Sequence, residues 1–132
     1  MRRRIDGFHH EEGAWFAELG CGHDRPVADE DWARSQDGRD GRIGEECECE
    51  ACDRFELPAR VLRSGATKEW SDASMPEALR RSHRVREGTW GRLVVRDGRI
   101  RFAAATSPPT DVVLEAGQSQ PIPPGLAHDV HP

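Results

Sequence analysis

The chain has 132 residues, of which 36% are hydrophobic and 33% are charged, and its formal net charge is -5. This length fits one domain of ordinary size or two very small ones, and it excludes a large multidomain enzyme. Because little apolar sequence is available for burial, we expect part of the chain to need a staple besides its core. No apolar run approaches the roughly 18 residues of a membrane span, and the sequence carries no signal peptide, so we expect a soluble, cytoplasmic protein with no membrane partner.

The first predicted element is a short hairpin, with strands over 5–10 and 14–19 on either side of a Glu-Glu-Gly turn. In the second of these strands Trp15, Ala17 and Leu19 alternate with other side chains, the pattern of a strand with one buried face. This strand runs directly into a Cys-Gly-His turn. The hairpin therefore positions the first two candidate metal ligands.

Weaker signals follow the hairpin. Residues 28–34 fit one or two helical turns, and a turn-rich loop follows at 37–41. Three cysteines over 47–52 close this half of the chain, and the Leu-Pro pair after them biases the backbone toward extended conformations. We take that pair as the boundary between two domains, residues 1–56 and residues 57–132.

Charge and cysteine content also differ between these halves. All four cysteines lie in residues 1–56, which hold 16 acidic against 8 basic side chains, a net charge of -8. Residues 57–132 hold 8 acidic and 11 basic side chains, a net charge of +3. In a reducing compartment such a cysteine cluster favours metal binding over disulfides. The negative charge argues against a nucleic-acid partner, because neutralising phosphates supplies most of the affinity for DNA or RNA.

The cysteine-rich half predicts a structural zinc site. Cys21 and His23 form one pair and Cys49 and Cys52 another, with 25 residues between the pairs. Each pair lies on a tight turn, and together they supply four donors for one tetrahedral ion with no position left open for catalysis. Cys47 is the spare cysteine and is an alternative to Cys49. Free cysteines beside a surface histidine, or a Cys-x-x-Cys redox pair, are the other interpretations.

A resemblance covers most of this half. The segments GFHHEEGAWFAELGCGH and IGEECECEACDR, within residues 5–54, resemble a family of small bacterial domains of uncharacterised function. That family pairs a Cys-Gly-His turn with a terminal Cys-x-x-Cys-Asp-Arg. Its further histidines are replaced here by Pro26 and Asp29, so any role they have is absent from this chain. The resemblance implies no activity.

The second half predicts short strands. Segments 90–95 and 99–105 flank an Asp-Gly pair that suits the two-residue turn of a hairpin, and 112–114 reads as another strand. Glycines and prolines punctuate the end of the chain. Strands of this length and spacing favour a small antiparallel β-barrel or sandwich.

A motif near the end of the chain is more specific. The spacing Gly117-x5-Pro123-x-Gly125-x2-His128 fits the second sequence motif of cupins. A turn of proline and glycine can aim the following histidine from a barrel strand into the interior, where neutral imidazole binds metals. This motif makes His128 a candidate ligand.

The segments MPEALRRSHRVREGTWGRLVVRDGRIRF and GQSQPIPPGLAHDVHP are similar to the cupin-like domain at the start of TehB tellurite-resistance proteins and in YeaR-like proteins. The resemblance implies a compact antiparallel barrel, with His83 and His128 as ligands of a second divalent metal. Val85 stands where the first cupin motif has its second histidine. Glu87 and His131 are candidate third ligands by proximity in sequence only.

Two departures limit what this resemblance implies. The methyltransferase domain of the longer tellurite-resistance proteins is missing, so methyl transfer is not implied. Relatives continue into at least one more strand beyond His131, so we expect an open barrel edge that a partner chain, as in a homo-oligomer, or another cover would protect.

Each of these side chains also has a plainer interpretation. His83 and His128 fit packing histidines at a barrel mouth, and two protein ligands make a weak metal site. Trp70 and Trp90 fit core or rim packing rather than substrate stacking. A basic cluster around His83 fits a solvated face better than an oxyanion site. This cluster consists of Arg80, Arg81, Arg84 and Arg86.

The sequence therefore predicts a mainly β protein, a small zinc-stapled module followed by a cupin-like barrel. We expect a non-enzymatic, metal-binding, stress-associated protein whose barrel binds a small molecule, an oxyanion or a metal. The alternatives are a small metalloenzyme using His83 and His128, with Glu87 as third ligand or general base, and an adaptor whose acidic zinc module docks a basic partner.

Overall fold

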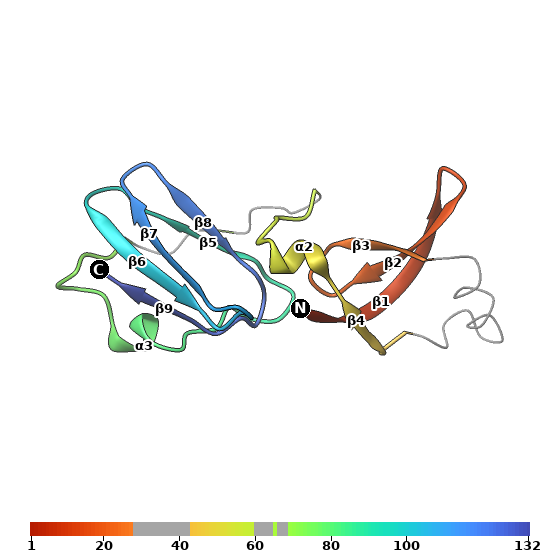
Figure 1. Ribbon diagram of the computed structural model, residues 1–132, viewed down its shortest axis with the longest axis horizontal. Coiled ribbons are helices and arrows are strands. Elements are labelled where there is room, and N and C mark those ends of the chain that lie inside the picture. The colour runs from red at the N-terminus through yellow and green to blue at the C-terminus, as the bar shows by residue number, and fades with distance from the viewer. Residues whose placement is uncertain (28–42, 60–64, 66–68) are drawn as a thin grey trace. The chain divides into compact units, whose positions relative to one another are not determined.

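A computed structural model describes residues 1–27, 43–59, 65 and 69–132 of the protein. The chain divides into two compact units, Met1–Val61 and Leu62–Pro132. Both are built from antiparallel sheets, so the prediction of a mainly β protein is confirmed (Figure 1). The helical turns predicted at 28–34 and the loop at 37–41 lie outside the described residues.

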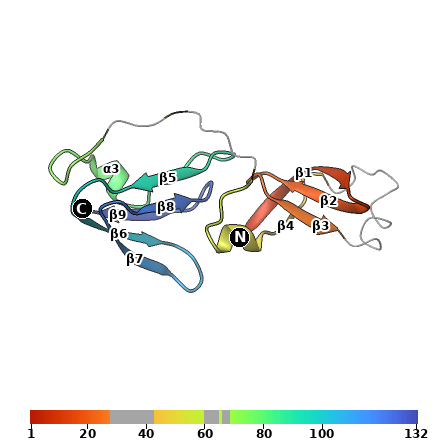
Figure 2. The ribbon, with the colours of Figure 1, turned by 90° about the horizontal axis from the view of Figure 1, so that it is seen from above.

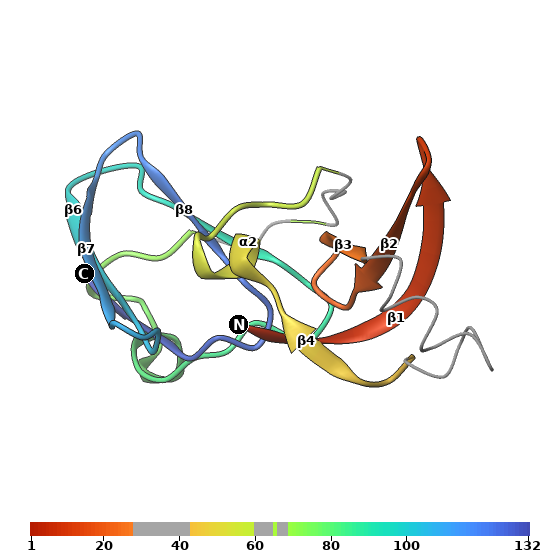
Figure 3. The same ribbon diagram turned by 45° about the vertical axis from the view of Figure 1, so that its right-hand side comes forward.

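Four strands of the first unit form one antiparallel sheet in the order β3-β2-β1-β4. Its elements are β1 (Arg2–Glu11), β2 (Ala14–Leu19), β3 (Asp24–Val27), β4 (Glu46–Glu48) and the helical turn α2 (Glu50–Asp53). β1 pairs with β4 at its start and with β2 from Ile5 to Glu11 (Figure 3). The predicted hairpin is confirmed as β1 and β2.

The apolar core of this unit is small. Ile5, Ala17 and Leu19 are buried, and the other buried residues in the described part of this unit are Pro58 and the four cysteines. Ala17 and Leu19 alternate along β2 with exposed or half-buried neighbours, as the sequence predicted. So few apolar side chains leave the unit dependent on a further source of stability.

The described strands of the second unit form two antiparallel sheets, β5-β8 and β7-β6-β9. In Figure 2 the β5–β8 pair lies on one side of the unit and β6 and β7 lie on the other. No hydrogen-bonded strand pair joins the two sheets among these strands, so the sheets do not close into a barrel. The elements are α3 (Glu77–Arg80), β5 (Gly91–Val94), β6 (Arg99–Ala104), β7 (Thr110–Glu115), β8 (Ser119–Ile122) and β9 (His128–His131).

Phe102 lies at the centre of the core of this unit. Its side chain is fully buried, and in the sheet it pairs with Val112 of β7 and Val130 of β9. Val95 and Ile122 are buried as well. No helix in the described part of the chain is long and apolar enough to cross a membrane.

One predicted pairing is wrong. Gly98 has the positive φ, +71°, that the Asp-Gly turn requires, but the strands on either side do not pair with each other. β5 pairs with β8, and β6 pairs with β7 and β9. Only the glycine of the predicted turn takes a positive φ, and the two strands lie in different sheets. Tertiary packing, rather than the local turn, decides which strands pair.

The edge of β9 is partly covered. On one side β9 pairs with β6, and on the other His83 and His128 form an isolated antiparallel bridge. Their backbones exchange two hydrogen bonds of 2.9 and 3.0 Å. This bridge brings the two histidines predicted from the cupin-like pattern side by side.

Candidate metal centre

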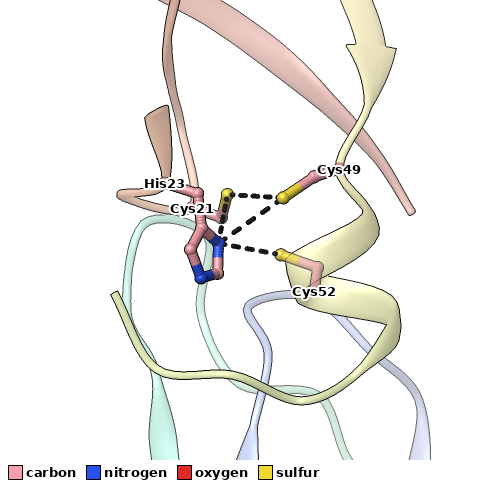
Figure 4. Close-up of side chains that lie close together, drawn as sticks. All are labelled: Cys21, His23, Cys49 and Cys52. Atoms are coloured by element: carbon pink, nitrogen blue, oxygen red, sulfur yellow. Dashed lines mark hydrogen bonds between the residues drawn. The ribbon is translucent and has the colours of Figure 1, made fainter. Parts of the chain in front are cut away.

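Two turns of the first unit bring four metal-binding side chains together. β2 ends in the Cys-Gly-His turn, which is closed by a 2.9 Å hydrogen bond from Leu19 N to the carbonyl oxygen of His23. Cys49 is the N-cap of α2, and Cys52 lies within that helical turn. Because residues three apart share one face of a helix, both sulfurs point toward Cys21 and His23 (Figure 4).

The four donor atoms are closely spaced. His23 Nδ1 lies 3.4 Å from the sulfur of Cys21, 3.5 Å from that of Cys49 and 3.6 Å from that of Cys52. The sulfurs of Cys21 and Cys49 are 3.8 Å apart, and no two of the four donor atoms are more than 4.8 Å apart. The three cysteines are buried and His23 is half-buried.

These distances fit a tetrahedral ion. With bonds of about 2.3 Å to sulfur and about 2.0 Å to nitrogen, the edges of a tetrahedron are about 3.8 Å between sulfurs and about 3.5 Å between sulfur and nitrogen. The three sulfur–nitrogen distances of 3.4–3.6 Å and the 3.8 Å between the sulfurs of Cys21 and Cys49 agree with these values. The group formed by Cys21, His23, Cys49 and Cys52 could therefore hold a metal ion.

The thiols of this group share protons unequally. A hydrogen bond from the Cys52 thiol lowers the pKa of Cys21 to about 5. The same contact with Cys21, together with burial, raises the pKa of Cys52, and burial raises the pKa of Cys49. A metal ion at this position would displace the remaining protons, because cysteine binds metals as the thiolate.

Cys47 does not belong to the group. It lies in β4 opposite Arg3 of β1 and is buried outside the set of four donors. Sequence alone left Cys47 and Cys49 as alternatives. The end of β4 decides between them. Cys47 lies within the strand, whereas Cys49 follows its last residue and begins the helical turn that carries Cys52.

The middle residue of the Cys-Gly-His turn requires glycine. Gly22 has a φ of +94°, and a Cβ there would lie 3.1 Å from Cγ of Pro58. We expect Gly22→Ala to lower the unfolding free energy by about 1–2 kcal/mol from the left-handed backbone alone, and further from the close approach. Gly44→Ala is the matched control, because Gly44 has a φ of +91° with nothing within 4 Å. Thermal unfolding that shows equal losses for both variants would contradict the role of the close approach.

A second pair of candidate ligands lies in the other unit. His83 Nδ1 is 3.4 Å from His128 Nε2, and the ring of His128 stacks on Phe102 at 5.6 Å. His128 Nδ1 donates a 3.0 Å hydrogen bond to the carbonyl oxygen of Leu126, which leaves its Nε2 as the acceptor toward His83. Burial lowers the pKa of His128, so its imidazole is neutral at pH 7.

The two halves of the chain match two different protein families. A model described as a TehB-like domain matches residues 66–132, half of the chain, and contains both His83 and His128. The chain belongs to the TehB-like family. A model described as a protein of unknown function (DUF3565) matches residues 6–56 and contains the four clustered ligands. No curated protein and no solved structure matches the chain.

In the TehB-like domain, the structure does not add a third ligand to His83 and His128. Among the described residues only the Cys and His group of the first unit brings three or more metal-binding side chains together. The Glu87 carboxylate lies against Gly125, where a Cβ would be 3.1 Å from its Oε1. His131 is exposed beside Asp129. Trp70 and Trp90 are half-buried, which agrees with packing or rim positions.

Three of the four arginines around His83 have separate partners. Arg80 donates to the backbone carbonyl of Met75, and Arg81 pairs at 3.1 Å with a carboxylate one helical turn away. Arg84 donates a 2.7 Å hydrogen bond to the carbonyl oxygen of Gly125. Because these three guanidinium groups bind three separate partners, they do not point at one shared oxyanion, and the arrangement supports a solvated face.

One side chain at the candidate metal centre is not predicted from the sequence. Arg3 Nε donates a 3.4 Å hydrogen bond to the sulfur of Cys52. The burial pattern of β1 alternates along the strand. Arg3 is half-buried and Ile5 is buried, whereas Arg2, Arg4 and Asp6 are exposed. That alternation places Arg3, unlike the arginines beside it, on the inner face of the sheet.

Proposed function

We propose that the protein is a non-enzymatic metal-binding protein in which residues 1–56 form a structural zinc module. The observation that carries this proposal is the tetrahedral spacing of three sulfurs and one imidazole nitrogen. Three cysteines and one histidine are a common structural zinc set. We place the protein in the cytoplasm, where reducing conditions keep the cysteines available as ligands.

Cys21, His23, Cys49 and Cys52 would hold the ion, which supplies folding free energy when it is bound. Four protein ligands leave no position for a water molecule or a substrate, which supports a structural rather than a catalytic role. The small apolar core supports the same conclusion, because zinc modules of this size depend on the metal for stability.

For the TehB-like domain we propose a weaker site at His83 and His128 that takes a divalent metal. The 3.4 Å between their facing nitrogens suits two ligands of one ion with bonds of about 2.1 Å. Only two protein ligands would leave positions for a small oxyanion. This arrangement agrees with the tellurite-related stress role that the resemblance to TehB implies.

Native mass spectrometry of protein purified without added metal tests both sites. We expect about one zinc per chain as purified, and a second divalent ion only after metal is added. His83→Asn should abolish the second ion and keep the zinc, whereas His131→Asn, an exposed histidine of the same domain, should keep both. Folded protein without any metal would overturn the zinc module, and a second ion that persists in His83→Asn would overturn the histidine site.

A further inference from the structure

We propose that Arg3 is a positioning residue of the metal centre, whose guanidinium holds the Cys52 thiolate by a hydrogen bond and offsets the negative charge of the zinc-loaded site. This inference rests on the proposed zinc module. It assigns a protective role to Arg3: the contact keeps Cys52 bound to the metal and lowers its reactivity toward electrophiles.

The fold separates Arg3 from its two arginine neighbours. Arg2 pairs with Glu46 at 3.2 Å and Arg4 pairs with Asp6 at 2.8 Å, and all four of these side chains are exposed to solvent. Arg3 lies between them on the opposite face of β1 and is half-buried. The consecutive arginines therefore have different surroundings, and Arg3 contacts a ligand sulfur.

The contact with Arg3 matters because the zinc-loaded site would carry a net negative charge. Three thiolates and a neutral imidazole around Zn²⁺ leave one negative charge on the centre. Cys52, the most deeply buried of the ligands, has 0% of its surface exposed. A buried charge is costly unless it is paired and hydrogen-bonded, and the guanidinium of Arg3 does both at the sulfur that water does not reach.

The same contact affects the reactivity of the sulfur. A zinc-bound thiolate reacts with iodoacetamide through a sulfur lone pair: the sulfur–carbon bond forms, iodide leaves, and zinc loses that ligand. A hydrogen bond from Arg3 draws electron density from this lone pair, so we expect it to slow alkylation at Cys52. Partners of this kind, one step outside the metal ligands, typically change metal affinity by about 10–100-fold when they are removed.

The experiment compares Arg3→Gln and Arg3→Lys with the matched controls Arg2→Gln and Arg4→Gln in the full chain. Competition with a chromophoric chelator gives zinc affinity, and peptide mass spectrometry gives the alkylation rate at each cysteine. We expect Arg3→Gln to weaken zinc binding by about 10–100-fold and to speed alkylation selectively at Cys52. Arg3→Lys, which keeps the charge, should recover part of both effects, and the two controls should behave as the wild type does.

Cobalt substitution supplies a readout that a loss of stability would not produce. The thiolate-to-Co²⁺ charge-transfer band should shift in Arg3→Gln and remain in place in Arg2→Gln. If Arg3→Gln does not fold, Arg3→Lys carries the same tests, and it should bind zinc less tightly than the wild type. Unchanged affinity and alkylation in the Arg3 variants, or equal losses in the Arg2 and Arg4 controls, would overturn the proposal. A wild-type protein that binds no zinc would instead overturn the proposed zinc module.

Discussion

Cys52→Ala is expected to abolish zinc binding and to unfold the first unit while the TehB-like domain stays folded. In the proposed zinc module, the variant removes one of four ligands, and metal binding contributes an apparent free energy of about 10–16 kcal/mol in small zinc modules. This free energy is comparable to the roughly 5–15 kcal/mol of net stability of a whole domain. The core formed by Ile5, Ala17 and Leu19 is too small to compensate for that loss.

The matched control for this prediction is Cys47→Ala. Cys47 is buried like Cys52 but lies outside the group of four donors, so its loss should cost packing and leave zinc bound. Zinc content by elemental mass spectrometry and segment-resolved hydrogen exchange measure both effects. Full exchange across β1 and β2 in Cys52→Ala, with protection retained in Cys47→Ala, is the expected pattern. Retained zinc and retained protection in Cys52→Ala would refute the structural role.

The ligand group could be predicted from sequence because its geometry is mostly local. Cys21 and His23 lie on one tight turn, and Cys49 and Cys52 lie on one helical turn, so spacing fixes each pair before any tertiary contact forms. Only the meeting of the two pairs depends on the sheet. The choice between Cys47 and Cys49 required knowing where β4 ends, and element ends are poorly encoded in a single sequence.

The pairing of the second unit could not be predicted in the same way. The Asp-Gly turn predicted that β5 and β6 would be hairpin partners, but β5 pairs with β8, which begins more than twenty residues later in the chain. Pairing between distant strands is decided by which apolar faces can be buried together, and this information is not local. The contact between Arg3 and Cys52 was missed for a similar reason, since it joins the first strand to a helical turn 49 residues away.

Phe102→Ala is expected to destabilise the TehB-like domain by about 3–5 kcal/mol, the cost typical of removing a buried aromatic ring. Phe102 has no exposed surface, and it lies between Val112 and Val130 in the three-stranded sheet. Val113→Ala is the control, because Val113 is on the neighbouring strand β7 and is 59% exposed, so its loss should cost within about 0.5 kcal/mol. Denaturant unfolding of the zinc-loaded proteins, followed segment by segment through hydrogen exchange in residues 91–131, gives both values.

A second substitution at this position separates packing from the orientation of the histidine. Phe102→Leu keeps most of the apolar volume but removes the ring that stacks on His128 at 5.6 Å. We expect it to restore most of the lost stability, because conserving volume in a core costs less than about 1.5 kcal/mol. If the stacked ring also orients His128, the leucine variant should still bind the second divalent ion less tightly than the wild type. Equal ion binding in the leucine variant and the wild type would show that the hydrogen bond from His128 to Leu126 and the bridge to His83 hold the imidazole without the ring.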